Sequence, residues 1–230
     1  MIDALAARAA AERYGGYVLD FESLTPGALA AYPAFLARLR AALKPAGREV
    51  WVTAFVSADS ATLRAFGQST DAVVLMAYDQ CWATSTPGPV AGLDWLTRSL
   101  DAKLADLDPA HTIVALGAYG YDWPDGGAAS VVSAPQAQAL AAASHAALAR
   151  NPAEANPHFA YTAADGKPHQ VWWLDAADYR SQRAAVLSRH VRGTAVWRLG
   201  LEDPSIWTHP GSGPATTNAT PAPFCTLLPH

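Results

Sequence analysis

Cysteine and methionine are scarce in this sequence of 230 residues, which has two of each. Cys81 and Cys225 stand far apart, so a disulfide-dense scaffold is excluded, and neither cysteine belongs to a metal-binding or redox spacing. The two thiols can pair in principle, but we expect no disulfide between them. The cysteines therefore indicate neither a metal centre nor redox chemistry.

An excess of basic charge is also lacking, since the formal net charge is −4. Nucleic acid is therefore not an expected partner. No uncharged apolar run reaches 18 residues, so we expect no membrane-spanning helix. The first residues, "MIDALAARAAAERYGG", have no basic stretch before an apolar core and are read as an Ala-rich helix rather than a signal peptide. Apolar residues make up 51% of the chain, enough for a sizeable core.

Segments with strand and helix patterns alternate along the chain, which predicts an α/β fold with a parallel sheet. Thr25 and Pro26 are typical of a helix start, and Pro33 is expected to divide that helix into two pieces. A hairpin turning at Asp165 and Gly166 is expected over 158–175. The remaining strands are expected at 17–22, 49–55, 71–79, 112–123 and 193–200, and helices at 2–14, 57–68, 91–107, 134–150 and 178–191.

The composition changes after residue 207, where proline, threonine and glycine become frequent. Such a segment is typical of a linker or a disordered tail. We therefore expect one folded domain over residues 1–207 and a disordered tail over 208–230.

The stretch "GGYVLDFE", residues 15–22, combines a strand pattern with two carboxylates, Asp20 and Glu22. Side chains two positions apart on a strand share one face, so Val18, Asp20 and Glu22 are expected to face a barrel interior or cleft. Two close carboxylates repel each other, and one of them then keeps its proton to higher pH. A protonated acid can give its proton to a leaving group. The pattern alone is more often an ordinary solvated strand end.

Aromatic residues at three other strand ends favour the catalytic interpretation. They lie in "LMAYD" at 75–79, "LGAYGYDW" at 116–123 and "AVWRLG" at 195–200. Sugar sites combine aromatic platforms with acids, because a sugar ring has apolar faces and a polar rim. Any one of these aromatic residues is more often part of a core, but together they indicate a carbohydrate cleft.

Taken in this order, the four motifs resemble glycoside hydrolase family 18, the chitinase-like hydrolases, over roughly residues 10–207. The nearest resemblance is to the bacterial branch with spore-cortex hydrolases and with hydrolase domains fused to polysaccharide deacetylase or glycosyltransferase modules. It implies a partial TIM (β/α)8 barrel, strands 4 to 8 with their helices. Because the first three strands have no counterpart here, a truncated reading frame or fragment is expected.

The resemblance also implies roles for named residues. Glu22 is the general acid, Asp20 orients the N-acetyl group of the substrate, and Tyr78 hydrogen-bonds that group. Asp79 is the acid beside it in the motif, and Trp197 forms the floor under the cleaved sugar. The cleft-lining motif contributes Tyr119 and Tyr121 as substrate-binding residues. No cofactor or metal is implied, since the acetamido oxygen of the substrate serves as the nucleophile.

The sequence departs from the family pattern at two positions. Gly15 stands where the first Asp usually is, and Val18 where many chitinases have the second. Val18 cannot share a proton with Asp20, so rate or pH optimum is expected to differ.

Three readings of function remain open on the sequence. The first is a hydrolase of β-1,4-linked N-acetylglucosamine polymers: chitin, peptidoglycan or an exopolysaccharide. The others are a non-catalytic carbohydrate-binding module on the same fold, and an inactive truncated fragment. Relatives usually act outside the cytoplasm, which is the location expected here although the chain shows no export signal.

Overall fold

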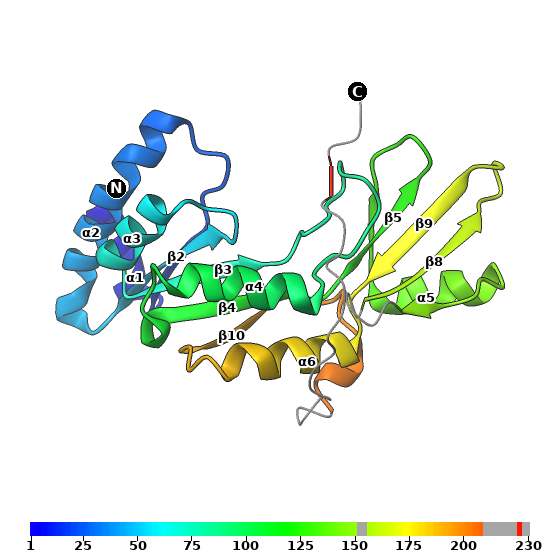
Figure 1. Cartoon of the computed structure of the whole chain (residues 1–230). Helices are drawn as coiled ribbons and strands as arrows, with labels where there is room; N and C mark the ends of the chain where they lie inside the picture. The colour runs from blue at the N-terminus through cyan, green and yellow to red at the C-terminus, as the bar shows by residue number, and fades with distance from the viewer. Residues whose placement is uncertain (151–155, 209–224, 227–230) are drawn as a thin grey trace. The chain divides into compact units, whose positions relative to one another are not determined.

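The computed structural model describes residues 1–150, 156–208 and 225–226 (Figure 1). The chain divides into two compact units. The first unit comprises Met1–Met76, Asp101–Val114 and His190–Gly193. Of the described residues, the second comprises 77–100, 115–150, 156–189, 194–208 and 225–226. The expected boundary at residue 207 lies beside the segment 209–224, which is outside the described residues, so the domain over 1–207 and the tail over 208–230 stay predictions.

Five strands form one sheet in the order β1-β2-β3-β4-β10. Strand β2 pairs in parallel with β1 and with β3. Strands β3 and β4 are buried along their whole length, as apolar strands covered on both faces are. The five strands are β1 (Gly16–Leu19), β2 (Glu49–Phe55), β3 (Ala72–Ala77), β4 (Thr112–Gly117) and β10 (Gly193–Trp197).

These positions confirm the five strands expected near residues 17, 50, 72, 113 and 194. The chain has a mixed α/β fold, consistent with part of a (β/α)8 barrel. The assignment of these strands as the fourth to eighth of a barrel stays a prediction.

Six α-helices accompany the strands in the described part of the chain. Helix α2 begins as expected: the side chain of Thr25 accepts a hydrogen bond of 3.3 Å from the amide of Ala28, and Pro26 follows. The expected division at Pro33 is wrong, because the buried side chains of Tyr32 and Leu36 lie in one continuous helix. The helices are α1 (Ile2–Ala11), α2 (Pro26–Leu43), α3 (Ser60–Ser69), α4 (Leu93–Leu104), α5 (Ala134–Ala143) and α6 (Ala176–Leu187). Within the described residues, none is long and apolar enough to cross a membrane.

A second sheet, which the sequence pattern did not predict, lies in the second unit with the order β6-β5-β9-β8-β7. Its central pair, β8 and β9, is the expected hairpin, and Gly166 in its turn has a φ of +85°. Its strands are β5 (Gly120–Pro124), β6 (Ser130–Val132), β7 (Ala149–Arg150), β8 (Pro157–Thr162) and β9 (Pro168–Trp173).

Two expected elements differ from the structure in their extent. The segment 112–123, which was expected to begin as an apolar strand, forms β4 and then β5, which join different sheets with Ala118 and Tyr119 between them. The helix expected over 134–150 stops at Ala143, because His145 takes a left-handed φ of +51° that a helix cannot continue.

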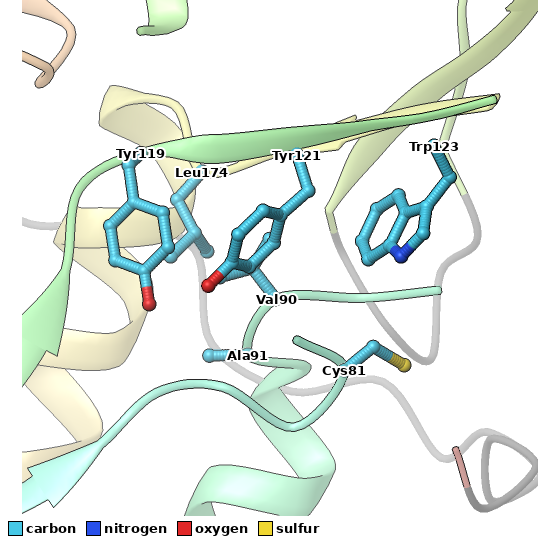
Figure 2. Close-up of a cluster of buried hydrophobic side chains, with 7 residues drawn as sticks. All are labelled: Cys81, Val90, Ala91, Tyr119, Tyr121, Trp123 and Leu174. Atoms are coloured by element: carbon cyan, nitrogen blue, oxygen red, sulfur yellow. The ribbon is translucent and has the colours of Figure 1, made fainter. Parts of the chain in front are cut away.

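Figure 2 shows the apolar cluster of the second unit, in which Tyr119, just before β5, projects from the same side of the chain as Tyr121 and Trp123 of β5. Cys81 belongs to this cluster and forms a disulfide with Cys225, so the expectation of unpaired thiols is wrong. The pairing arises because the two segments meet: the amide of Thr86 donates a hydrogen bond of 2.7 Å to the carbonyl of Thr226. Sequence separation alone does not reveal such a contact.

Candidate active site

The first acidic pair follows β1 rather than lying within it. Leu19 pairs with Val52 at the end of the strand, and Asp20 and Glu22 come after that point. The strand was expected to continue to Glu22, but the left-handed φ of +54° at Ser23 turns the chain toward the start of α2. The argument that Asp20 and Glu22 share one strand face is therefore wrong, whereas their position at the carboxyl end of β1 is as expected. The proposed retention of a proton by one of them stays a prediction.

Asp20 is held by a residue from the neighbouring strand. Oδ1 of Asp20 accepts a hydrogen bond of 2.6 Å from the hydroxyl of Thr53. The parallel register places them together, since Leu19 pairs with Val52 and the next residue of each strand follows. No motif in the sequence points to Thr53, although the alternation of "EVWVTAF" places it on the face opposite the buried Val50 and Val52.

A cavity of about 280 Å³ lies beside Glu22 in the first unit. Its wall is largely apolar, and two of the aromatic side chains that line it, Phe21 and Phe55, are 56% and 48% exposed. Such a wall can cover the apolar face of a sugar. Lining residues include Phe21, Glu22, Leu24, Thr53, Phe55 and Phe66.

A third acidic residue, Asp79, is held by two phenols within the second unit. It follows β3 by two residues and takes a left-handed φ of +58°, a conformation that Asp tolerates better than most residues. Oδ1 of Asp79 accepts a hydrogen bond from the hydroxyl of Tyr119 and another of 3.0 Å from that of Tyr121. Two donors on one oxygen restrict the orientation of this carboxyl group.

Burial is the largest influence on the pKa of the Asp79 carboxyl group. It raises the pKa of Asp79 above its ordinary value, and the hydrogen bonds from Tyr119 and Tyr121 act in the opposite direction because they favour the ionised form. Burial, followed by the nearby charge of Asp79, raises the pKa of both tyrosines, which therefore stay protonated donors.

Aromatic rings of the second unit stand beside this carboxyl group. The ring of Tyr78 lies parallel to that of Trp197, with centroids 6.4 Å apart and an interplanar angle of 8°. The carbonyl of Trp197, which precedes a cis peptide bond, accepts a hydrogen bond of 2.7 Å from the amide of Ala118. Trp197 is 45% exposed and can present its ring to a ligand.

A cavity of about 160 Å³ lies beside Asp79 and Trp197 within the second unit. Asp79, Tyr119, Tyr121 and Trp197, four of the residues predicted from the motifs, line it. Tyr119 and Tyr121 are only 4% and 6% exposed, so they contribute mainly by holding Asp79. Arg198 also lines the cavity and was not predicted, since a single basic residue after a strand carries no distinctive signal.

No group of three or more His, Cys, Asp or Glu side chains in the described part of the chain is arranged to hold a metal ion. The side chains that line the two cavities can transfer protons through carboxyl groups, donate hydrogen bonds from phenols and stack through an indole.

Comparison with known proteins identifies the family to which the chain belongs. The family model described as "Glycosyl hydrolases family 18" matches residues 3–202, and the chain belongs to that family. The resemblance read from the four motifs is thereby confirmed, including its spore-cortex branch. The cortical fragment-lytic enzyme of Bacillus subtilis (strain 168) is 30% identical over 214 residues, which is 86% of this chain and 49% of that protein.

Two solved structures share the fold. A chitinase from Chromobacterium violaceum ATCC 12472 has a TM-score of 0.83 and 29% identity, covering 90% of this chain and 68% of the other. The spore cortex-lytic enzyme SleL of Bacillus megaterium QM B1551 has a TM-score of 0.80 and 24% identity, covering 90% of this chain and 51% of the other. The chain spans about half the length of the curated relatives that it matches.

Proposed function

We propose that this chain supplies the catalytic residues of a glycosidase that cleaves β-1,4-linked, N-acetylglucosamine-containing polysaccharide with retention of configuration. The observation that carries the proposal is where the predicted residues stand along their strands. Asp20 directly follows β1, Tyr78 and Asp79 directly follow β3, and Trp197 ends β10. In (β/α)8 enzymes, catalytic residues come from the carboxyl ends of the strands.

The proposed reaction uses the substrate's own acetamido group. Its carbonyl oxygen attacks the anomeric carbon and forms a cyclic oxazolinium intermediate, while Glu22 protonates the departing glycosidic oxygen. Water then opens the intermediate, and Glu22, now ionised, takes the proton of that water. No nucleophile from the protein is needed.

The other residues have positioning roles in this proposal. Asp20 orients the acetamido group and balances the positive charge that develops on it, and Tyr78 donates a hydrogen bond to the same group. Trp197 supports the apolar face of the sugar, and Asp79 accepts a hydrogen bond from a sugar hydroxyl. Tyr119 and Tyr121 act through Asp79.

The names of the relatives, a chitinase and cortical fragment-lytic enzymes, favour chitin or peptidoglycan as the substrate. The disulfide between Cys81 and Cys225 favours action outside the cytoplasm, because reducing compartments rarely keep such bonds. Association with deacetylase or glycosyltransferase modules remains part of the proposal.

The test compares Glu22→Gln with the unchanged chain on a labelled N-acetylglucosamine oligosaccharide and on a peptidoglycan fragment. Glu22→Gln should lower kcat by at least about 100-fold, the scale of general acid catalysis, while binding of the oligosaccharide persists. The matched control is Glu12→Gln at the exposed end of α1, which should keep full activity. Equal turnover by Glu22→Gln and the unchanged chain contradicts the proposal, and binding without turnover by the unchanged chain supports a non-catalytic carbohydrate-binding module.

A further inference from the structure

The carboxylate of Asp20 needs a fixed orientation to act on an acetamido group, yet the strand that precedes it offers no polar partner. Val18, two residues earlier, is aliphatic and 53% exposed. The polar partner comes from β2 instead, where Thr53 donates its hydroxyl proton to Oδ1 of Asp20 over 2.6 Å.

We propose that Thr53 is a positioning residue for Asp20, fixing one carboxylate oxygen so that the other is presented to the substrate. This inference rests on the proposed function. Thr53 is a neutral donor, so it orients the carboxylate without offering a second acidic group with which Asp20 could share a proton.

The distances decide which acceptor receives the single hydroxyl proton of Thr53. Oγ1 lies 2.6 Å from Oδ1 of Asp20 and 3.4 Å from the carbonyl oxygen of Leu19. A hydroxyl bonded to a carboxylate is typically 2.5–2.7 Å away, whereas 3.4 Å is long for any hydroxyl bond. The proton therefore goes to Asp20.

The pairing of β1 with β2 fixes the contact between Thr53 and Asp20. Thr53 belongs to the half-exposed face of β2, because Val52 and Ala54 on either side of it are buried. The pairing of Leu19 with Val52 then sets Asp20 next to Thr53. A one-residue shift of register would turn Thr53 to the opposite face, so the contact depends on the sheet and not on a mobile side chain.

A second hydroxyl near Asp20 is a rival for the same role. The side chain of Tyr32 is 6% exposed, and burial followed by the charge of Asp20 raises its pKa to about 12. Among the described residues, however, the Tyr32 hydroxyl has no hydrogen-bond partner. Proximity to Asp20 is thus shared by both hydroxyls, but the hydrogen bond is made by Thr53.

The experiment compares three variants of the full chain on a labelled N-acetylglucosamine oligosaccharide. Thr53→Val keeps the shape but removes the hydroxyl, and should lower kcat about tenfold with a smaller change in KM, because one charge-assisted hydrogen bond is lost. Thr53→Ser restores the hydroxyl and should recover most of the activity. Tyr32→Phe, the matched control, should leave kcat unchanged.

A readout independent of turnover separates this inference from the proposed function. The couplings between the α and β protons of Asp20, measured by NMR, should report one rotamer in the unchanged chain and in Thr53→Ser, and averaged rotamers in Thr53→Val. If Glu22→Gln retains full turnover, the proposed function fails while this rotamer result still stands.

Two results would overturn the role of Thr53. One is a Thr53→Val protein with unchanged kcat and unchanged Asp20 couplings, and the other is a loss of kcat in Tyr32→Phe instead. If Thr53→Val unfolds, Thr53→Ala serves as the second variant, and in an Asp20→Asn background it should cause no further loss of activity. A further loss in that background would show that Thr53 does not act through Asp20.

Discussion

Tyr121 donates a hydrogen bond of 3.0 Å to Oδ1 of Asp79, the same oxygen that accepts a hydrogen bond from Tyr119. Both phenols are almost fully buried, so water cannot readily replace Asp79 as their hydrogen-bond partner. Breaking either bond would therefore cost free energy. The burial that raises the pKa of Asp79 is thus partly offset by the two groups that orient it.

Replacing Tyr121 by Phe removes one of these bonds and keeps the ring. The pKa of Asp79 should then rise further, because a bond that favours the ionised form is lost. More of Asp79 is protonated at a given acidic pH, so the acidic limb of the pH–rate profile should move to higher pH. We expect a loss of about tenfold in kcat/KM at acidic pH.

The control for Tyr121→Phe is Tyr161→Phe, which removes a phenol that donates a hydrogen bond of 2.8 Å to Asp122 elsewhere in the second unit. Its pH–rate profile should match that of the unchanged chain. A profile that is identical in Tyr121→Phe and the unchanged chain would mean that ionised Asp79 is not required.

Trp197→Ala tests the aromatic floor. Its ring is 45% exposed and lies parallel to that of Tyr78, so removal takes away a platform with little disturbance of the core. The stacking and apolar contact that Trp197 gives to a sugar contribute about 1–2 kcal/mol to binding, so their loss corresponds to a rise in KM of roughly 5- to 30-fold. Trp207→Ala is the matched control, since Trp207 is 53% exposed and its indole bonds Glu202. Equal KM values for the two variants would contradict the proposed role of Trp197 as the aromatic floor under the sugar.

The elements that the sequence predicted well are those set by local pattern. The β-branched and aromatic residues of "EVWVTAF" predicted β2 with its bounds, and the apolar run before Tyr78 predicted the buried strand β3. The N-cap at Thr25 and the turn at Gly166 were also found, because each depends on the chemistry of one or two residues.

The features that the sequence did not predict depend on contacts between distant segments. Thr53 becomes notable only when the register brings it to Asp20, 33 residues away. Cys81 and Cys225 are separated by 144 residues, and only the folded chain shows that they meet. The second sheet was not predicted either, because its strands β6 and β7 have only three and two residues and are too short to show a periodic pattern.

Asp178 should make the stability of the chain depend on pH. Burial, followed by the charge of Asp175, raises its pKa well above the ordinary value, although Arg150 acts against the shift through an ion pair of 2.8 Å. The folded state therefore binds this proton more tightly than the unfolded state. The free energy of unfolding should fall as the pH rises from the unfolded-state pKa through the folded-state pKa.

Asp178→Asn should reduce that dependence, which urea unfolding between about pH 4 and pH 7 measures. Some slope should remain, since the pKa of Asp79 is raised as well and acts in the same direction. Asp165→Asn, in the exposed hairpin turn, is the control and should keep the slope of the unchanged chain. If the free energy of unfolding of Asp178→Asn depends on pH as steeply as that of the control, the raised pKa of Asp178 does not contribute to the pH dependence of stability.

Cys225→Ser tests the disulfide that the sequence did not lead us to expect. The bond closes a loop spanning 144 positions, and such long loops gain most from a cross-link because the unfolded chain loses much of its freedom. Its loss should lower the free energy of unfolding by about 2–5 kcal/mol. Thermal unfolding with and without a reductant measures this: reductant should lower the Tm of the unchanged chain toward that of Cys225→Ser and leave the variant unaffected. Thiol titration of the denatured, unreduced chain should detect no free thiol, and two free thiols in that titration would contradict the bond.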